Sequence, residues 1–374
     1  CEKQGTQSNI KQAPVPSCPI PKGYATPSLL SQIITSKYQY GLPLYRQETM
    51  FKQHGIEISR RTMSDWMMKC EALFKPLYIR LHEILLSQPM LQADETTLKV
   101  INDERYKSYI WVYCSGIDAP VEPKSDGDTL LRNIVLFDYQ NGSRSGRCAS
   151  RFLQGFNGYL QTDGYSAYQQ VNAKHVGCWA HARRKFVDAQ TAQGKAKSGK
   201  VNVALSYIQK LYGIEKSIAA LPVNEKQQLR QLKAKPILAE FKAWLDKSAL
   251  QVSKKGKLGV ATTYNSNQWD KLLGYLDDGL LNIDNNRAER AVKPFVIGRK
   301  NWLFNVNHNG AETSAMLYSI IETAKANGLV PFDYINHCLE QLAKSPQDLD
   351  SLLPWNVDLK KKLDVLRYTL TLHQ

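Results

Sequence analysis

The sequence lacks several features that mark common protein classes. Its seven cysteines are an odd number with scattered spacing, and no two of them form a C-x-x-C pair. This pattern argues against a disulfide framework and against a complete zinc ribbon or finger. No apolar run approaches the roughly 18–20 residues that span a bilayer, and the polar, proline-containing N-terminus is unlike a secretory signal. These absences predict a protein of a reducing cytosol with no membrane segment.

The sequence also has fewer acidic residues than basic ones. The 374 residues include 34 Asp and Glu against 49 Lys and Arg, so the formal net charge is +15 and the isoelectric point lies near 9.3. A large positive field attracts polyanions, nucleic acid first and anionic membrane second. Membrane-surface proteins usually carry a basic amphipathic helix with an apolar face, and none stands out here. We therefore expect nucleic acid as the partner.

The first part of the chain is predicted to be irregular and then helical. Residues 1–27 form a proline-containing lead-in that begins at Cys1 without an initiator methionine. We expect from this that an upstream part is missing. Residues 28–88 repeat apolar positions at helical spacing and predict a small helical region ahead of a larger domain.

A helix-turn-helix is one interpretation of this helical region. The stretch PLYRQETMFKQHGIEISRRTMSDW predicts a helix, a break at Gly55 and a second helix, for which Ser59 is a good N-cap. The second helix would present Arg60 and Arg61 to DNA. A plain helical hairpin packed on the next domain fits the same pattern equally well.

From Pro89 onward, strand patterns replace helical ones. Three runs rich in β-branched and aromatic residues come first, in the order MLQADETTLKV, RYKSYIWVYCSG and NIVLFDYQ. A predicted helix (SRSGRCASRFLQGF), a fourth strand with a turn (GYLQTDGYSAY) and a short fifth strand entering a helix (HVGCWAHARRKFVDAQ) follow. This succession is the order of a ribonuclease-H-like fold, so we predict an α/β fold with a mixed sheet.

Beyond the fifth strand the chain turns helical and rich in lysine, which predicts a helical insertion into the sheet domain. The predicted organisation is a lead-in over 1–27, a helical DNA-binding region over 28–88, the first part of the sheet domain over 89–190, the insertion over 191–283, the last part of the sheet domain over 284–345 and a charged, peripheral C-terminal tail over 346–374.

Two acids occupy matching places in the predicted sheet. Asp94 lies in the first strand and Asp163 ends the fourth, and these strands are neighbours in a ribonuclease-H-like sheet. Carboxylates at one level on adjacent strands suit Mg²⁺ or Mn²⁺, which prefer oxygen ligands and accept phosphate oxygens. A third carboxylate from a facing helix, for which Glu289 is the candidate, would complete a two-metal site.

The strand acids also have ordinary structural interpretations. Asp163 precedes Gly164, and Asp-Gly often marks only a turn. Asp94 adjoins Glu95, and because neighbours in a strand point to opposite faces, only one of them enters the site. We favour Asp94 and expect Glu95 to be solvated. Asp138, at the end of the third strand, is a rival ligand that we interpret as a loop-edge acid.

Glu289 has an alternative role as a helix cap. Asn286 and Glu289 have the N-cap-to-N3 spacing of a capping box, with Asn in place of the usual Ser or Thr. Pro294 would end or kink that helix one turn later. On the residues alone, the capping role and the metal role both stay open.

Basic residues gather near these acids in the sequence. We predict that they contact DNA phosphates, although a solvated charged surface is the plainer interpretation; they are Arg183, Arg184, Lys185, Arg287, Arg290, Lys293, Arg299 and Lys300.

Cys178 and His181 form a C-x-x-H pair. Because two ligands make no structural zinc site, we favour a strand-to-helix packing pair.

The motifs together resemble a known family. ADET, LQTDGYSAY, GCWAHARRKF, DNNRAERAVKPFVIGRKNWLF and YSIIETAKANGLVPFDY occur in this order after YGLPLYRQETMFKQHGIEISRRTMSDW. They are similar to motifs of the transposases of bacterial insertion sequence 66 elements (TnpC type), and the similarity covers nearly the whole chain. The resemblance implies a DDE transposase on a ribonuclease-H-like fold, with the family's first Asp at Asp94, its second at Asp163 and its Glu at Glu289.

The resemblance also implies a way of working. A transposase of this kind uses two Mg²⁺ or Mn²⁺ ions to hydrolyse a phosphodiester at the element end, and the freed 3′-OH then attacks target DNA. The implied partners are double-stranded DNA, further copies of the chain and helper proteins encoded by the same element, in the bacterial cytoplasm at the nucleoid. Family members carry a cysteine-rich zinc-binding domain upstream; Cys1 would be its remnant, and Gln4 stands where a second cysteine is expected.

Two other kinds of protein fit parts of the pattern. A ribonuclease-H-like nuclease would cut DNA without joining it. A DNA-binding remnant would keep the helix-turn-helix beside an inert catalytic fold. The three acids speak against the remnant, since an inert site has no need of them.

Overall fold

The computed structural model describes residues 18–21, 23–117, 131–193, 199–346 and 348–359, so most of the predicted lead-in lies outside the described residues. The strands are β1 (Met90–Leu98), β2 (Ser108–Ser115), β3 (Ile134–Asp138), β4 (Tyr159–Gln161) and β5 (Lys174–Val176). The α-helices are α1 (Pro27–Tyr38), α2 (Leu44–Gln53), α3 (Arg60–Leu86), α4 (Gly146–Phe152), α5 (Trp179–Gln193), α6 (Lys200–Ile218), α7 (Val223–Leu229), α8 (Lys235–Ala249), α9 (Lys257–Asn267), α10 (Trp269–Leu273), α11 (Asn286–Trp302), α12 (His308–Ala326) and α13 (Pro331–Leu342). Within these ranges, none of the helices combines the length and the apolar character that crossing a bilayer requires.

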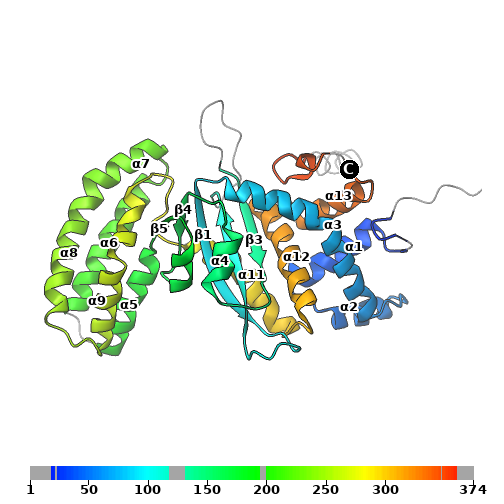
Figure 1. Cartoon of the computed structure of the whole chain (residues 1–374), viewed down its shortest axis with the longest axis horizontal. Coiled ribbons are helices and arrows are strands. Elements are labelled where there is room, and N and C mark those ends of the chain that lie inside the picture. Colours follow the sequence, from blue (N-terminus) through cyan, green and yellow to red (C-terminus); the bar gives the residue numbers. More distant parts are fainter. Residues whose placement is uncertain (1–17, 22, 118–130, 194–198, 347, 360–374) are drawn as a thin grey trace, which may run out of the picture.

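The five strands form one mixed sheet in the order β3-β2-β1-β4-β5 (Figure 1). β1 pairs antiparallel with β2 and parallel with β4, β2 pairs antiparallel with β3, and β4 pairs parallel with β5. The prediction of an α/β fold with a mixed sheet is therefore confirmed. β1, which carries Asp94, lies at the centre of the sheet beside β4, as expected.

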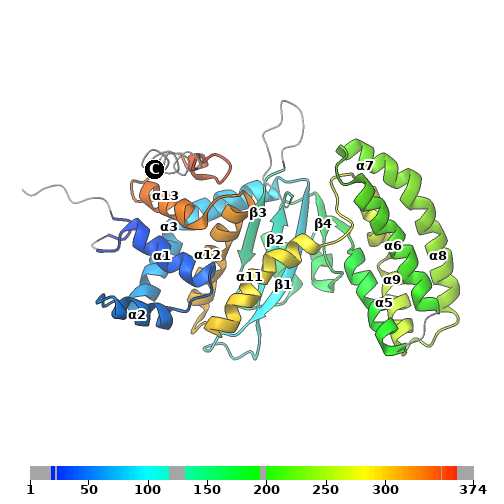
Figure 2. The same cartoon turned by 180° about the vertical axis from the view of Figure 1, so that it is seen from behind.

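One face of the sheet is covered by α11 and α12. The register places Asp94 opposite Val112 and Val112 opposite Phe137, so these side chains share a face. The Phe137 ring packs against Phe295 of α11 and Tyr318 of α12, with ring centroids 6.0 and 5.5 Å away. Figure 2 shows α11 crossing this face over β1 and β2. Glu289, in the first turn of α11, is thereby brought to the face that carries Asp94.

The opposite face is covered by α3, α4 and the 3₁₀ turn at Ser166–Gln170. Glu95 lies opposite Trp111, and Trp111 lies opposite Asp138. The Trp111 ring meets Tyr168 of the 3₁₀ turn edge to face, with centroids 5.4 Å apart. Glu95 and Asp138 consequently point away from α11.

The N-terminal helices share one hydrophobic core with the sheet and with the C-terminal helices. α1 packs against α12 and α13, and Figure 1 shows α1, α2 and α3 beside these helices. The Ser59 hydroxyl caps α3 as predicted, because it accepts a hydrogen bond from Thr62 N at 3.1 Å. Further along α3, the Tyr78 hydroxyl donates to the Phe137 carbonyl at 3.0 Å. α3 thus joins the start of this region to the sheet, and its helix-turn-helix role stays a prediction.

A second hydrophobic core lies beyond β5 and is built mainly by α5, α6, α8, α9 and α10. Trp179 of α5 anchors it, with ring centroids 6.0 Å from both Phe241 and Trp269. In Figures 1 and 2 this bundle stands at the β5 end of the sheet, opposite α1 and α2. Its helices occur in the chain between β5 and α11, where helical structure was predicted.

The structure contradicts two details predicted for the last third of the chain. Pro294 was expected to end or kink α11, and it does not end the helix, which continues to Trp302 with Phe295 and Gly298 buried against the core. The described part of the tail is not peripheral either. Leu352 and Leu353 are buried, and the Leu352 carbonyl accepts a hydrogen bond from the Tyr334 hydroxyl at 2.8 Å.

Candidate functional site

Asp94 is fixed in the central strand on the face covered by α11. Its Oδ1 accepts a hydrogen bond from the backbone N–H of Glu95 at 2.8 Å. Burial, and to a smaller extent the negative charges of Glu95, Asp163 and Glu289, together raise the pKa of Asp94 to about 7. The structure therefore brings Asp163 and Glu289 close enough to Asp94 to act on its charge.

Asp163 lies in a turn just beyond β4. Its Oδ1 accepts a hydrogen bond from Tyr165 N at 2.8 Å, and Gly164 has a φ of 91°, so the turn that Asp-Gly suggested is present. The Tyr264 hydroxyl of α9 donates to the Asp163 carbonyl at 2.6 Å and ties this turn to the helical bundle. Because the turn uses only Oδ1, it leaves Oδ2 for a ligand role.

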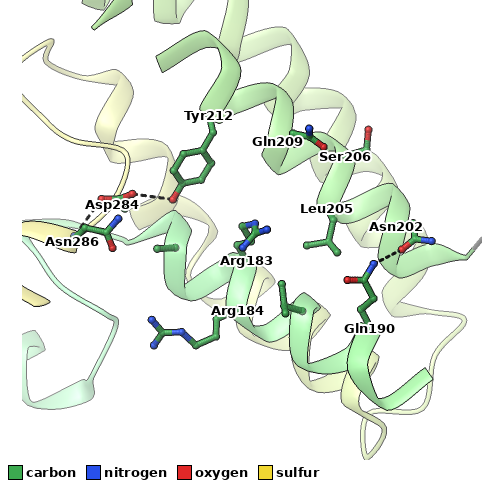
Figure 3. Close-up of a pocket in the computed structure, with 12 residues that line it drawn as sticks. Arg183, Arg184, Gln190, Asn202, Leu205, Ser206, Gln209, Tyr212, Asp284 and Asn286 are labelled. Atoms are coloured by element: carbon green, nitrogen blue, oxygen red, sulfur yellow. Dashed lines mark hydrogen bonds between the residues drawn. The ribbon is translucent and has the colours of Figure 1, made fainter. Parts of the chain in front are cut away.

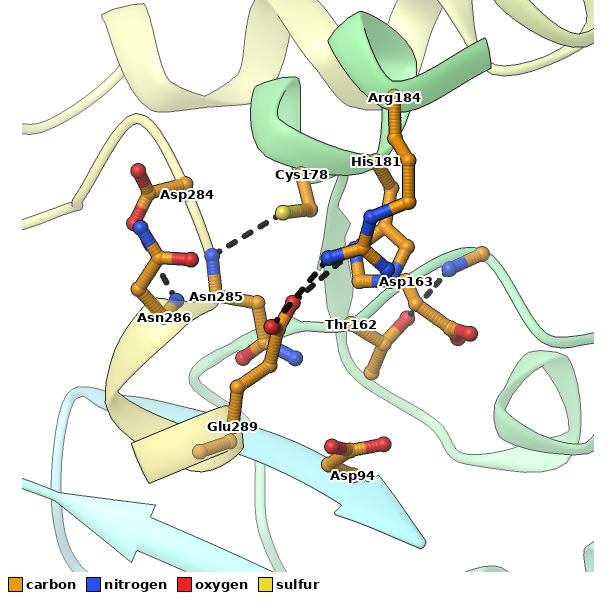
Figure 4. Close-up of polar contacts among 12 residues, drawn as sticks. Asp94, Thr162, Asp163, Cys178, His181, Arg184, Asp284, Asn285, Asn286 and Glu289 are labelled. Atoms are coloured by element: carbon orange, nitrogen blue, oxygen red, sulfur yellow. Dashed lines mark hydrogen bonds and ion pairs between the residues drawn. The ribbon is translucent and has the colours of Figure 1, made fainter. Parts of the chain in front are cut away.

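Glu289 does not cap its helix. The N-cap of α11 is Asn285 rather than Asn286, and its side chain bonds no N–H of the first turn. The Glu289 carboxylate instead reaches α5: Oε1 lies 3.6 Å from His181 Nδ1, and Oε2 lies 3.5 Å from Arg184 Nη2 (Figure 4). The capping alternative is therefore excluded by the geometry.

The three carboxylates are suitable ligands for a hard divalent cation, but their side chains do not converge on a common point. They are oxygen donors of the type that Mg²⁺ and Mn²⁺ prefer. Burial is the main cause of the raised pKa of Asp94, and repulsion from the neighbouring acids, which a cation would offset, adds to it. Across the described ranges, no three His, Cys, Asp or Glu side chains gather closely enough to hold one metal ion. Figure 4 shows the Glu289 carboxylate directed at His181 and Arg184, with Asp94 below it on β1.

Glu95 and Asp138 are separated from this site by the register of the sheet. Both lie on the face away from Asp94. Glu95 is not solvated as expected, because its side chain is 6% exposed and Oε1 accepts a hydrogen bond from Arg144 at 2.7 Å. Its Oε2 accepts another from the Tyr168 hydroxyl at 3.0 Å. Asp138 therefore cannot join Asp94 as a ligand.

The structure divides the predicted DNA-contacting residues by exposure. Lys185 is half-buried, with its ammonium group 5.4 Å from the centre of the Tyr264 ring. Arg299 is half-buried and donates hydrogen bonds to Thr96 Oγ1 at 2.9 Å and to the Thr97 carbonyl. The exposed members of the set are Arg60, Arg61, Arg183, Arg184, Arg290, Lys293 and Lys300.

Arg287 was wrongly predicted to contact DNA. Its side chain is buried, and Nη2 donates to the Ser115 carbonyl at 2.8 Å and to Asn133 Oδ1 at 3.3 Å. The reason is helical periodicity: the face of α11 that carries Arg287 packs on the sheet, whereas Arg290 and Lys293 lie on the outer face. Arg287 therefore anchors α11 to β2.

The side chains of Cys178 and His181 have different partners. The buried Cys178 sulfur accepts a hydrogen bond from Asn285 N at 3.2 Å, and burial raises the pKa of the thiol to about 11. Cys178 thus has the packing role that was expected. His181 instead faces Glu289, and burial lowers its pKa although Asp163 and Glu289 oppose this shift.

A buried amide network behind the acids was missed from the sequence. Gln92 Nε2 donates to Gln161 Oε1 at 2.7 Å, and Gln161 Nε2 donates to the Asn282 carbonyl at 2.7 Å. Asn285 Nδ2 donates to the Ala93 carbonyl at 2.9 Å. These bonds join β1, β4 and the start of α11. The available signal was a glutamine at an inward position of each apolar strand, where a polar side chain needs a partner.

Carboxylates on a mixed sheet and its facing helix, beside exposed arginines, form an arrangement suited to enzymes that act on nucleic-acid backbones. The chain belongs to the Transposase IS66 family, whose model matches residues 22–313, and the model of the IS66 C-terminal element matches residues 319–355. The resemblance drawn from the sequence motifs is thereby confirmed. Membership makes this a transposase-type protein of the DDE class, a class of DNA-binding enzymes that generally use divalent metal ions.

Relatives from Sinorhizobium fredii match over nearly the whole chain. The proteins named Uncharacterized protein y4jD and Uncharacterized protein y4qI are 34% and 32% identical to it over 370 and 367 residues. These alignments each cover 94% of this chain, and 70% and 66% of the two relatives. A third, Uncharacterized protein y4hP, is 29% identical over 365 residues, covering 92% of this chain and 65% of its own length. The chain thus spans about two thirds of the length of these relatives.

Proposed function

We propose that this chain is a DDE transposase that hydrolyses a phosphodiester bond at the end of an insertion sequence and joins the freed 3′-OH to target DNA. The observation that carries the proposal is the placement of Asp94 on the central strand, Asp163 in the turn after β4 and Glu289 in the facing first turn of α11, beside exposed arginines. The strand order β3-β2-β1-β4-β5 supports our assignment of the sheet to the ribonuclease-H-like fold.

The three acids would hold two Mg²⁺ or Mn²⁺ ions. When bound, such ions activate the attacking oxygen and stabilise the leaving oxygen. Each acid comes from a fixed element: Asp94 from the central strand, Asp163 from the turn closed by Tyr165, and Glu289 from the first turn of α11. Fixed elements reduce the cost of aligning groups for reaction. Joint binding of a cation requires the Glu289 carboxylate to turn from Arg184 toward Asp94.

Exposed basic side chains would hold the DNA backbone next to these acids. Arg184 already lies against Glu289, and the outer face of α11 carries Arg290 and Lys293. Their guanidinium and ammonium groups would neutralise phosphates on either side of the reacting bond. Arg60 and Arg61, at the start of α3, supply a second candidate contact farther from the acids.

We further propose that the protein works on double-stranded DNA as a homo-oligomer, together with helper proteins encoded by the same element, at the bacterial nucleoid. An insertion sequence has two ends, and each active site processes one 3′ end at a time. Coordinated movement of both ends therefore favours more than one copy of the chain on the DNA.

A strand-transfer assay tests the proposed reaction. A labelled duplex carrying an element end is incubated with the protein, Mg²⁺ and an unlabelled plasmid. We expect cleavage at the element end, followed by transfer of the label to the plasmid. Cleavage without transfer would favour a nuclease, and DNA binding with neither reaction would favour an inert remnant.

A further inference from the structure

A groove between α5 and α6 opens beside the candidate acids (Figure 3). It has a volume of about 860 Å³, which lies within the range of roughly 300–1,000 Å³ that is usual for small-ligand pockets. α5 contributes Arg183 and Arg184 to one wall, and α6 contributes Leu205, Ser206 and Tyr212 to the other. The segment leading into α11 closes one end of the groove.

Arg183 gives the groove wall a positive charge that is not used in contacts within the described protein. Arg183 is exposed and makes no hydrogen bond or ion pair with any residue in the described ranges. The carboxylate that lines the groove, Asp284, is already engaged, because Oδ2 accepts a hydrogen bond from the Tyr212 hydroxyl at 3.1 Å and Oδ1 accepts one from Asn286 N at 3.2 Å. An anion is therefore the expected occupant.

The rest of the lining suits a flat, partly apolar group with polar edges. Leu205 and Val187 provide apolar surface, Tyr212 provides an aromatic ring, and Gln209 provides an amide. A nucleotide unit of a DNA strand combines a phosphate with such a base. A groove of about 860 Å³ has the size of a small-ligand pocket, which suits one nucleotide unit and is far smaller than a duplex.

The position of the groove connects it to the candidate acids. Arg184 lines the groove and also lies 3.5 Å from Glu289. Asn286 lines its end and begins the helix that carries Glu289. A strand that lies in the groove is thus led to the start of α11, next to the acids.

We propose that the groove between α5 and α6 binds an unpaired segment of the DNA strand adjoining the bond that is cut, with a phosphate on Arg183 and a base against the Leu205–Tyr212 wall. The proposal rests on the proposed function, since that strand is its substrate. It adds a single-strand subsite on the helical bundle, formed outside the sheet.

A matched pair of substitutions on α6 tests the groove. Ser206 lines it and is exposed, whereas Ser217 is exposed on the same helix and does not line it. We expect Ser206→Glu to weaken binding of a fluorescent oligo-dT strand about tenfold, because it sets a carboxylate against the phosphate. Binding of a duplex of equal length should match that of Ser217→Glu, and so should the melting temperature. Gln209→Glu is a second groove variant with the same expected effect.

The outcomes separate the groove from the proposed function. Equal losses for the single strand and the duplex, or no loss in either groove variant, would overturn the groove as a single-strand subsite. If the wild-type chain transfers strands while both groove variants bind oligo-dT normally, the groove proposal alone fails. If the wild-type chain binds neither substrate, the proposed function fails as well.

Discussion

Arg184 and Glu289, 105 residues apart in the chain, face each other across α5 and α11, with 3.5 Å between Arg184 Nη2 and Glu289 Oε2. α5 belongs to the core of the helical bundle and α11 to the core of the sheet. The contact between Arg184 and Glu289 therefore links the two parts of the structure, and it involves a candidate catalytic acid. Residues near this junction divide into those that hold the fold and those that remain available for DNA, and substitutions can tell them apart.

Arg287 and Arg290 form the first such contrast, since they lie on opposite faces of α11. Arg287→Ala removes a buried donor to the Ser115 carbonyl and should lower the free energy of unfolding by about 2–3 kcal/mol. Arg290→Ala, at an exposed position, should change it by less than about 0.5 kcal/mol but weaken DNA binding. Urea denaturation and a DNA-binding titration measure the two effects. A stable Arg287→Ala protein with weakened DNA binding would instead support the original prediction that Arg287 contacts DNA.

The basic patch on α5 predicts a salt-dependent affinity for DNA. Reversing Arg183, Arg184 and Lys185 to Glu should weaken binding to any sequence, and the slope of log affinity against log salt should flatten by about 0.9 for each phosphate that the protein no longer neutralises. The control reverses three exposed lysines elsewhere on the bundle, Lys254, Lys255 and Lys257, which changes the net charge equally. If both triple variants behave alike, only net charge matters and the α5 patch is solvated surface.

The sequence predicted the strands well because each carries β-branched and aromatic residues between clear breaks. Alternation alone predicted that Asp94 and Glu95 lie on opposite faces of the sheet, and the register confirms this. The burial of Glu95 could not, because it depends on Arg144 and Tyr168, which approach from elements far along the chain. Alternation along a strand predicts on which face of the sheet a side chain lies. Whether that face is exposed to solvent depends on tertiary contacts.

Helical segments were harder to interpret at the level of single residues. In α11 the charge-rich run around Glu289 concealed a buried position, since Arg287 donates hydrogen bonds from Nη2 to groups inside the fold. The capping-box spacing at Asn286 was present, but the helix begins after Asn285, so the spacing is out of register by one residue. Local pattern therefore predicted the helix and missed the orientation of its side chains.

The start of α3 offers a further test of DNA contact. Arg60 and Arg61 are exposed, so Arg60→Ala and Arg61→Ala should leave stability within about 0.5 kcal/mol of wild type. If the second helix of the pair enters a DNA groove, each substitution should weaken DNA binding. Lys69→Ala, exposed nearby on the same helix, is the control. Unchanged affinity in both arginine variants would favour the plain helical hairpin.

Asp138 should make stability depend on pH without contributing to catalysis. Burial raises its pKa from 3.8 to about 7, so the folded state binds its proton more tightly than the unfolded state does. Its favourable contribution is fully present below about pH 4 and is lost as the pH rises through 7. Asp138→Asn removes this loss of stability at high pH, because asparagine does not ionise. The variant should be close to wild type at pH 4 and more stable by up to about 4 kcal/mol at pH 8.

Urea denaturation at the two pH values measures the Asp138 effect, and a cleavage assay completes the comparison. Asp138→Asn should cleave DNA normally, since the register puts this acid on the far face from Asp94. Loss of cleavage in a stable Asp138→Asn protein would contradict the separation of the two faces.

The three candidate acids should behave as one unit. Asp94→Asn, Asp163→Asn and Glu289→Gln keep side-chain volume and remove charge, and each should reduce strand cleavage about a thousandfold or more, with double variants hardly worse than single ones. Asp94→Asn should also stabilise the fold at neutral pH, because burial and neighbouring acids raise the pKa of Asp94 to about 7. Asp188→Asn, exposed on α5, is the control and should retain activity.

Glu289 is the decisive member of this unit. Its contacts with His181 and Arg184 are long, at 3.6 and 3.5 Å, and its side chain is 30% exposed, so Glu289→Gln should cost little stability. If the carboxylate binds metal, the variant should lose cleavage with Mg²⁺ and with Mn²⁺, and calorimetry should show weakened Mn²⁺ binding while the melting curve stays near that of wild type. Normal cleavage by a folded Glu289→Gln protein would remove Glu289 from the site. Because the register also excludes Asp138, the third ligand would then have to come from another element or from a second copy of the chain.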